Sequence, residues 1–237
     1  MMNMNIIEKY LNELDFSYDE KQIDNFNKYY ELLVEWNKKF NLTSITEYED
    51  VVLKHFIDSI LICKFIEFKG KRIIDVGTGA GFPGIPLKIM NPDSEIILLD
   101  SLNKRINFLN TVIKELKLSN IIALHGRAED VSREKKYRGS FDYSVSRAVA
   151  NLSTLSEYCI PFLKTGGCFV SYKSDKSEDE INSAKKAIKI LKSRIIKVEE
   201  TGLPGTDIIR RFVIIENIEP VDMRYPRKAG IPSKDPL

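Results

Sequence analysis

From Lys71 onward, short apolar runs alternate with stretches in which apolar residues recur every three or four positions. The runs predict strands near 72–77, 95–100, 121–126, 141–147 and 167–172. Apolar residues at helical spacing predict two amphipathic helices. One follows the second strand, with Leu102, Ile106, Leu109, Ile113 and Leu116, and the other follows the fifth, with Ile181, Ala184, Ile188 and Leu191. Two further strands, near 194–201 and 208–217, flank a turn at 203–206. The pattern predicts an α/β fold with a mostly parallel seven-stranded sheet, helices on both faces and a terminal antiparallel hairpin.

The two ends of the chain have different patterns. Residues 1–70 have helical spacing, with one face at Ile23, Phe26, Tyr30, Leu33 and Val34 and a second helix from about 50 to 65. Residues 220–237 hold four of the nine prolines and several basic residues, which favours an extended chain. The chain therefore divides into a helical extension (1–70), an α/β domain (71–219) and a basic, proline-rich tail (220–237).

Residues 73–84 predict a strand, a loop and a helix that together hold a cofactor. A β-branched strand contains Asp75, and Gly77, Gly79 and Gly81 follow at alternate positions before Pro83. Glycines let a loop turn sharply and approach a ligand closely. Gly79, Gly81 and Gly84 also fit the dinucleotide fingerprint, but a carboxylate at Asp75 would repel a pyrophosphate. The acid favours a ligand with an amino group and a sulfonium, S-adenosylmethionine. A glycine-rich turn without a ligand is the alternative.

Other cofactor contacts are expected where the parallel strands end, because ligands of open α/β sheets bind there. Asp100 ends the second strand, 21 residues after Gly79, and fits the acid that binds ribose hydroxyls. It is also a possible N-cap of the next helix. Glu129 follows the third strand and fits either the adenine edge or an acidic first helical turn.

Three basic residues at strand ends, Arg127, Arg147 and Lys173, are predicted to position the substrate through phosphate, guanine O6 or a ligand carboxylate. An ordinary salt bridge is the alternative for Arg147. The chain lacks the Asn/Asp-Pro-Pro-aromatic loop typical of methylation at exocyclic amines, and it has no cysteine nucleophile at a strand end. Guanine N7 has a free lone pair and no proton to lose, so in-line methyl transfer to it needs no general base. His55 and Asp58 lie one turn apart on a predicted helix, which favours a hydrogen-bonded structural pair over a catalytic one.

Composition adds few constraints. The chain has 237 residues, is 43% hydrophobic and carries a net charge of +2, so any nucleic-acid surface must be local.

The tail is predicted to bind RNA phosphate and to stack on a base through Arg224, Tyr225, Arg227 and Lys228. The alternative is a tail that packs on the domain for structural reasons. Three widely spaced cysteines predict a reducing compartment and no metal site. Without a long apolar stretch, we expect a cytoplasmic protein with no membrane partner, and a monomer.

Seven groups of residues recur in this order in one family. They are Asn41-Leu42-Thr43; His55-Phe56-Ile57-Asp58-Ser59; residues 75–87, with the string Gly-Phe-Pro-Gly-Ile-Pro; Asp100-Ser101 with Lys104-Arg105; Gly126-Arg127-Ala128-Glu129; Ser146-Arg147-Ala148; and Tyr225-Pro226-Arg227-Lys228 with Gly230-Ile231-Pro232. Together they strongly resemble the bacterial small-subunit ribosomal RNA guanine-N7 methyltransferases, also called glucose-inhibited division protein B. The resemblance spans about residues 41–237.

The resemblance implies a Rossmann-like, class I methyltransferase that uses S-adenosylmethionine to modify one guanine in the decoding region of 16S ribosomal RNA. The RNA would be free, in an assembly intermediate or in the small subunit. The resemblance implies that the cofactor is held by Gly77, Gly79, Phe82, Ala128, Glu129 and Arg147, with Asp100, Ser101 and Leu102 beside the ribose. Ser174 follows Lys173 where the family tends to have glycine, which leaves the role of Lys173 open.

Three other functions remain open on the residues alone. A nicotinamide-dependent oxidoreductase would need a second substrate domain and a proton donor, and neither is visible in the sequence. A non-enzymatic ribosomal RNA-binding or assembly factor would retain the cofactor fold without methyl transfer. A small-molecule methyltransferase would lack RNA binding that weakens with salt.

Overall fold

The computed structural model describes residues 5–147 and 149–237. Its centre is a seven-stranded sheet in the order β3-β2-β1-β4-β5-β7-β6. The strands are β1 (Arg72–Val76), β2 (Glu95–Asp100), β3 (Ile121–His125), β4 (Phe141–Arg147), β5 (Leu163–Ser174), β6 (Ser193–Gly202) and β7 (Ile209–Asn217). The first five pair in parallel, and β7 runs antiparallel to β5 and β6. The predicted sheet and its terminal hairpin are confirmed.

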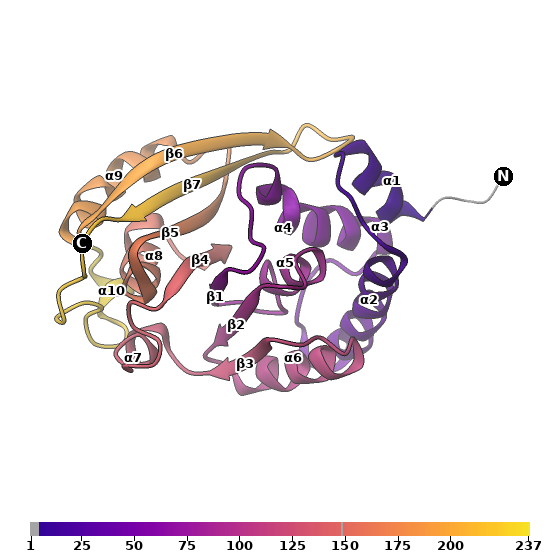
Figure 1. Ribbon diagram of the computed structural model, residues 1–237, viewed down its shortest axis with the longest axis horizontal. Coiled ribbons are helices and arrows are strands. Elements are labelled where there is room, and N and C mark those ends of the chain that lie inside the picture. The colour runs from indigo at the N-terminus through magenta and orange to yellow at the C-terminus, as the bar shows by residue number, and fades with distance from the viewer. Residues whose placement is uncertain (1–4, 148) are drawn as a thin grey trace.

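Helices cover both faces of the sheet (Figure 1). One face carries α5 (Gly84–Met90), α6 (Asn103–Glu115) and the N-terminal helices, and the other carries α7 (Ala128–Val131), α8 (Leu152–Cys159) and α9 (Glu178–Ile190). Successive strand residues explain the two cores, because their side chains point to opposite faces. In β1, Ile73 packs with the first set of helices, and Ile74 and Val76 pack with the second.

The N-terminal helices are α1 (Ile6–Glu13), α2 (Glu20–Phe40), α3 (Tyr48–Val51), a π-helix η1 (Val52–Ile57), α4 (Asp58–Ile60) and a 3-10 helix η2 (Leu61–Lys64). The helix expected over 50–65 is present, but its π-helical turn was not predicted. Tyr29 of α2 is fully buried, stacks on Phe56, and donates its hydroxyl to the Ala80 carbonyl in the glycine loop. The extension therefore supports the loop that the sequence singles out, and a division at residue 70 stays a prediction.

Two further elements differ from expectation. β5 begins at Leu163, four residues before the predicted start, because Leu163 already pairs with Phe141 of β4. Gly166 and Gly167 separate Leu163 from the apolar run, so the sequence pattern did not indicate this first part of the strand. The tail, expected to be extended, contains a short helix α10 (Ile231–Lys234) with a proline in its first turn, where a backbone N–H is not needed.

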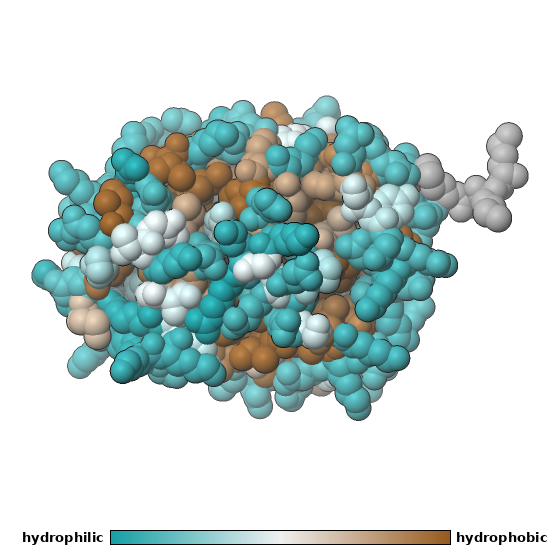
Figure 2. Space-filling model, in the orientation of Figure 1, coloured by the Kyte–Doolittle hydropathy of each residue, from teal (hydrophilic) through white to brown (hydrophobic). Residues whose placement is uncertain are grey.

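The surface is mostly hydrophilic in the view of Figure 2, with hydrophobic patches over β6 and near β3. β3 and β6 are the two edge strands of the sheet. Large apolar residues are exposed on both, Ile122 on β3 and Ile196 and Val198 on β6. Within residues 5–147 and 149–237, no helix is long and apolar enough to cross a bilayer.

Candidate functional site

Three cavities lie in a row along the edge where the parallel strands end. The first, about 330 Å³, extends from Gly77 past Asp100 to Glu129 and Tyr158. The second, about 400 Å³, extends from the glycine loop to Arg147 and His55. The two share Gly77, Asp100, Ser101 and Val149, so they form one continuous groove. The third, about 470 Å³, shares His55 and Arg147 with the second. The site is therefore a groove for an elongated ligand with a separate cavity beyond Arg147.

The backbone of Gly77 forms the floor where the first two cavities meet. Its φ is +74°, in the left-handed region that side chains disfavour. A Cβ at this position would lie 2.7 Å from the Cγ2 atom of Val149. The backbone conformation and the contact with Val149 both disfavour a side chain at this position, and cofactor binding by Gly77 stays a prediction.

Asp75 has a different role from the one expected. Its Oδ2 atom accepts hydrogen bonds from the Thr78 hydroxyl at 2.7 Å and the Gly84 N–H at 2.8 Å. Complete burial raises the pKa of this carboxyl to about 7. Asp75 lines none of the three cavities. The carboxyl holds the loop against the start of α5, so it does not face a positive ligand group as the sequence predicted.

Asp100 lies at the middle of the groove, at the end of β2, and lines both of its cavities. Its Oδ2 atom accepts from the Gly79 N–H at 2.9 Å and from Arg105 at 3.1 Å. Among the described residues, its Oδ1 atom accepts only the Leu102 N–H, at 2.9 Å. An ionised carboxylate offers about four acceptor positions, so one remains on Oδ1 for a ligand hydroxyl. Leu102 contributes this backbone contact, and its side chain is exposed outside the cavities.

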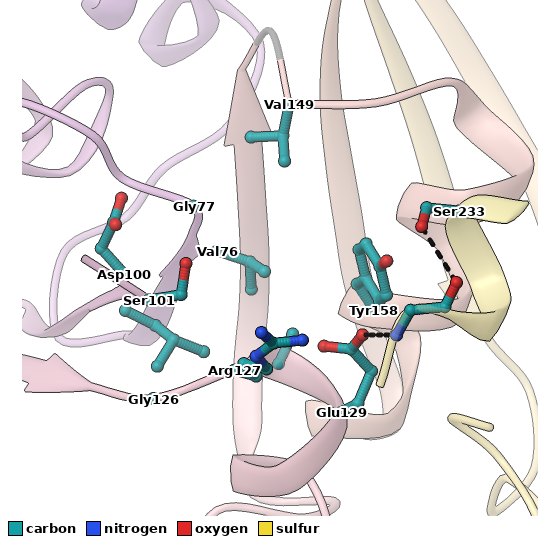
Figure 3. Close-up of a pocket in the computed structure, with 13 residues that line it drawn as sticks. Val76, Gly77, Asp100, Ser101, Gly126, Arg127, Glu129, Val149, Tyr158 and Ser233 are labelled. Atoms are coloured by element: carbon teal, nitrogen blue, oxygen red, sulfur yellow. Dashed lines mark hydrogen bonds between the residues drawn. The ribbon is translucent and has the colours of Figure 1, made fainter. Parts of the chain in front are cut away.

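Glu129 and Tyr158 close the other end of the first cavity, and Figure 3 shows both side chains there. Glu129 is buried at the start of α7, next to Ala128, and its Oε1 atom accepts the Gly230 N–H at 3.1 Å. Gly230 and Ser233 of the C-terminal segment also line this cavity. The sequence did not predict three residues that line this cavity, Tyr158, Gly230 and Ser233. The one signal available for them was the Gly230-Ile231-Pro232 motif in the family resemblance.

Arg147, at the end of β4, joins the second cavity to the third. It donates to Asp58 Oδ2 at 2.8 Å and to the Lys54 carbonyl at 3.1 Å, and its guanidinium lies 5.1 Å from the Phe82 ring centroid. Arg210 of β7 donates to the other Asp58 oxygen at 2.5 Å. Asp58 is only 3% exposed, so this carboxylate balances two arginines in a largely dry environment.

His55 completes the Arg147 surroundings as a neutral ring. Its Nδ1 atom accepts from Arg147 at 3.2 Å, so the proton is on Nε2, which donates to the Thr43 hydroxyl at 2.8 Å. Burial, and then the neighbouring Arg147 charge, lower the pKa of His55 to about 3. The ring also stacks on Phe82 at 4.5 Å. The side-chain hydrogen bonds of His55 and Asp58 connect both residues to Arg147, and in the described part of the chain no hydrogen bond joins the two side chains to each other. The hydrogen-bonded side-chain pair expected from the sequence is therefore not formed, and a structural rather than catalytic role for the two residues stays a prediction.

The three basic residues expected to position substrate do not lie together. Arg147 and Lys173 line the third cavity with Lys54 and Arg210, and Lys173 pairs with Glu180 at 2.6 Å. Arg127 is exposed and lines the first cavity instead. Ala148, which follows Arg147 in the sequence motif, lies outside the described residues.

Comparison with known proteins identifies the family. The family model described as rRNA small subunit methyltransferase G matches residues 22–209. The chain belongs to this family. It is 49% identical over 238 residues to the ribosomal RNA small subunit methyltransferase G of Clostridium tetani, covering 100% of both chains. It is 50% identical to the protein of that name from Acetivibrio thermocellus, covering 92% of this chain and 90% of the relative. The resemblance seen in the sequence motifs is confirmed.

Solved structures of more distant proteins share the fold. The M. jannaschii TYW2 structure in complex with AdoMet has a TM-score of 0.57 at 17% identity, over 74% of this chain and 80% of that one. A SAM-dependent methyltransferase from Aquifex aeolicus has a TM-score of 0.56 at 16% identity, over 74% and 97%. The expected methyltransferase fold is therefore confirmed for this family member.

The family's Tyr225-Pro226-Arg227-Lys228 motif packs on the domain. The Arg227 side chain pairs with the fully buried Glu157 of α8 at 2.8 Å, and the partly buried Tyr225 packs against the core on that face. Arg224 is exposed and pairs with Asp222, and Lys228 is exposed. These contacts match the alternative of a packed tail, and RNA binding by the four residues stays a prediction.

The described residues contain no group of three or more His, Cys, Asp or Glu side chains placed to hold a metal ion.

Proposed function

We propose that this member of the family binds S-adenosylmethionine in the groove and transfers its methyl group to N7 of one guanine in the decoding region of 16S ribosomal RNA. The observation that carries the proposal is the arrangement at Arg147. The cofactor groove ends there, beside a cavity lined by four cationic side chains, and no free base lines that end among the described residues. Guanine N7 is an acceptor that needs no base.

The groove has groups suited to each part of S-adenosylmethionine. Glu129 would accept a hydrogen bond from the adenine amine, next to the Tyr158 ring. The remaining acceptor position of Asp100 Oδ1 suits a ribose hydroxyl. Arg105 and Arg147 line the second cavity, where a carboxylate would find positive charge. When bound, the cofactor supplies a methyl group made electrophilic by its sulfonium.

The chemistry of N7 fits the protonation of the side chains at this end. In-line transfer would form the new N–C bond from the N7 lone pair, leave the C–S bonding electrons on sulfur and move the positive charge to the base, so no side chain would have to take up a proton. His55 is neutral with its Nδ1 lone pair already bound to Arg147, and both oxygens of Asp58 are paired with arginines. Neither group is free to remove a proton, as N1 or exocyclic amine methylation would require.

The third cavity would receive the target nucleotide. Lys54, Arg147, Lys173 and Arg210 line it, together with apolar contributions from Ile45, Tyr172 and Ile208. Cationic side chains suit a phosphate or the O6 atom of guanine, and apolar ones suit a base. We assign Arg147 and Lys173 to positioning rather than to N7 itself, because a cation at N7 would oppose the developing charge.

Mapping the modified nucleotide tests the proposal. Incubation of the enzyme and S-adenosylmethionine with 16S RNA from cells that lack this protein should add one methyl group to one guanosine. Borohydride reduction followed by aniline should cleave the RNA at that site, because only N7 methylation makes the guanine ring labile. Free RNA, assembly intermediates and finished subunits would be compared as substrates.

Three results would contradict the proposal. RNA binding without methyl transfer would indicate an assembly factor, and binding of a nicotinamide dinucleotide in place of S-adenosylmethionine would indicate an oxidoreductase. A methyl group that resists aniline cleavage would overturn the N7 assignment alone.

A further inference from the structure

The C-terminal segment, residues 218–237, passes over the α7 and α8 side of the sheet after β7 ends (Figure 1). Two arginines from the loop before β4 hold its first part. Arg138 donates to the carbonyls of Val221 and Tyr225 at 3.0 Å each, and Arg133 donates to the Pro226 carbonyl. These hydrogen bonds to backbone carbonyls fix the path of residues 221–226 along the domain.

The next residue, Arg227, is held by a buried carboxylate. Glu157 of α8 is 0% exposed and accepts the Arg227 N–H at 2.6 Å, its Nε–H at 3.0 Å and its Nη2–H at 2.8 Å. Arg227 is the only salt-bridge partner of Glu157 among the described residues. A buried charge with a single partner makes that partner hard to displace. The Arg227–Glu157 pair therefore fixes the chain at this point.

Three residues later the same segment forms part of the cofactor groove. The Gly230 N–H donates to Glu129 Oε1 at 3.1 Å, and Thr154 of α8 donates its hydroxyl to the Pro232 carbonyl at 2.9 Å. Gly230 and Ser233 line the first cavity across from Asp100 and Ser101. Figure 3 shows Ser233 and Glu129 on the same side of this cavity, with Asp100 and Ser101 on the other.

We infer that Arg227 is a positioning residue for the cofactor. Its ion pair with Glu157 places residues 229–234 as a wall of the cavity that receives adenosine, which makes Arg227 a determinant of S-adenosylmethionine affinity rather than an RNA contact. The adjacent Lys228 is exposed and has no ion pair in the described part of the chain, so it is available to RNA phosphates. Two neighbouring basic residues of one motif thus have separate tasks. The inference rests on the proposed placement of the cofactor.

The two residues provide matched variants, Arg227→Met and Lys228→Met. Calorimetry would measure the cofactor affinity of each variant, and fluorescence anisotropy at two salt concentrations would measure its RNA affinity. Arg227→Met should weaken S-adenosylmethionine binding by about tenfold, a loss of ~1.4 kcal/mol. It should raise KM for the cofactor and leave kcat at saturation nearly unchanged, and Arg227→Lys should recover part of the loss. Lys228→Met should leave cofactor affinity unchanged, weaken RNA binding and lower its salt slope by about one.

Hydrogen exchange on the unmodified protein provides a second measurement that does not depend on how the variants fold. S-adenosylmethionine should slow exchange at residues 229–234 and at Glu129. Unchanged exchange in that segment, or an Arg227→Met variant that loses only RNA affinity, would overturn the inference. If the unmodified protein bound no S-adenosylmethionine, the proposed function would fail instead, so the two failures are distinguishable.

Discussion

Replacing Gly77 with valine should abolish S-adenosylmethionine binding and with it methyl transfer. Gly77 has a φ of +74°, which costs a side-chain-bearing residue about 1–2 kcal/mol. The added Cβ would also lie 2.7 Å from Val149 Cγ2, and the remaining methyl groups would project into the groove where its two cavities meet. Calorimetric titration should show a cofactor affinity reduced by at least about a hundredfold, equivalent to ~2.7 kcal/mol.

Gly70 offers a matched control for the strain in this experiment. Its φ of +67° is similar, but nothing lies within 4 Å of a Cβ built there, and it is exposed in the turn before β1. Gly70→Val should therefore lower stability by a comparable strain energy and leave cofactor affinity unchanged. Equal cofactor affinity in Gly77→Val and the unmodified protein would show that the ligand does not lie against this loop.

The sequence predicted the sheet and the glycine loop because both are local patterns. Apolar runs indicate buried parallel strands, and glycines at alternate positions indicate a backbone conformation that other residues disfavour. The role of Asp75 could not be predicted in the same way. An acid beside a loop serves a ligand or the loop itself, and only the positions of the Thr78 hydroxyl and the Gly84 N–H decide between them.

The remaining features of the site depend on residues far apart in the chain. Arg210 reaches Asp58 across 152 positions because β7 inserts between β5 and β6, and Arg227 reaches Glu157 across 70. A basic residue in a proline-rich segment has the same local signature whether it binds phosphate or a buried glutamate. The π-helical turn that carries Lys54 and His55 lies in a stretch that the sequence predicted as an ordinary helix, although such turns often mark functional sites.

Replacing Asp58 with asparagine should produce the largest loss of stability among single polar substitutions near the site. The carboxylate is 3% exposed and pairs with Arg147 and Arg210, which are themselves only 14% and 23% exposed. Asparagine keeps the volume but leaves two poorly solvated cations without their anion. Removing one partner of such a buried network costs roughly 3–5 kcal/mol. Urea unfolding should show a lower midpoint with an unchanged slope.

Asp50 is the matched control for this prediction, because it pairs with Lys54 at 2.7 Å in the same helical stretch but both side chains are partly exposed. Asp50→Asn should change stability by no more than about 1 kcal/mol. Adding Arg210→Met to Asp58→Asn should recover part of the loss, because one of the two uncompensated charges is then removed. A loss no greater in Asp58→Asn than in Asp50→Asn would mean that solvent, rather than this carboxylate, balances the two arginines. Arg147 would then be held beside the groove by His55, the Lys54 carbonyl and the Phe82 ring.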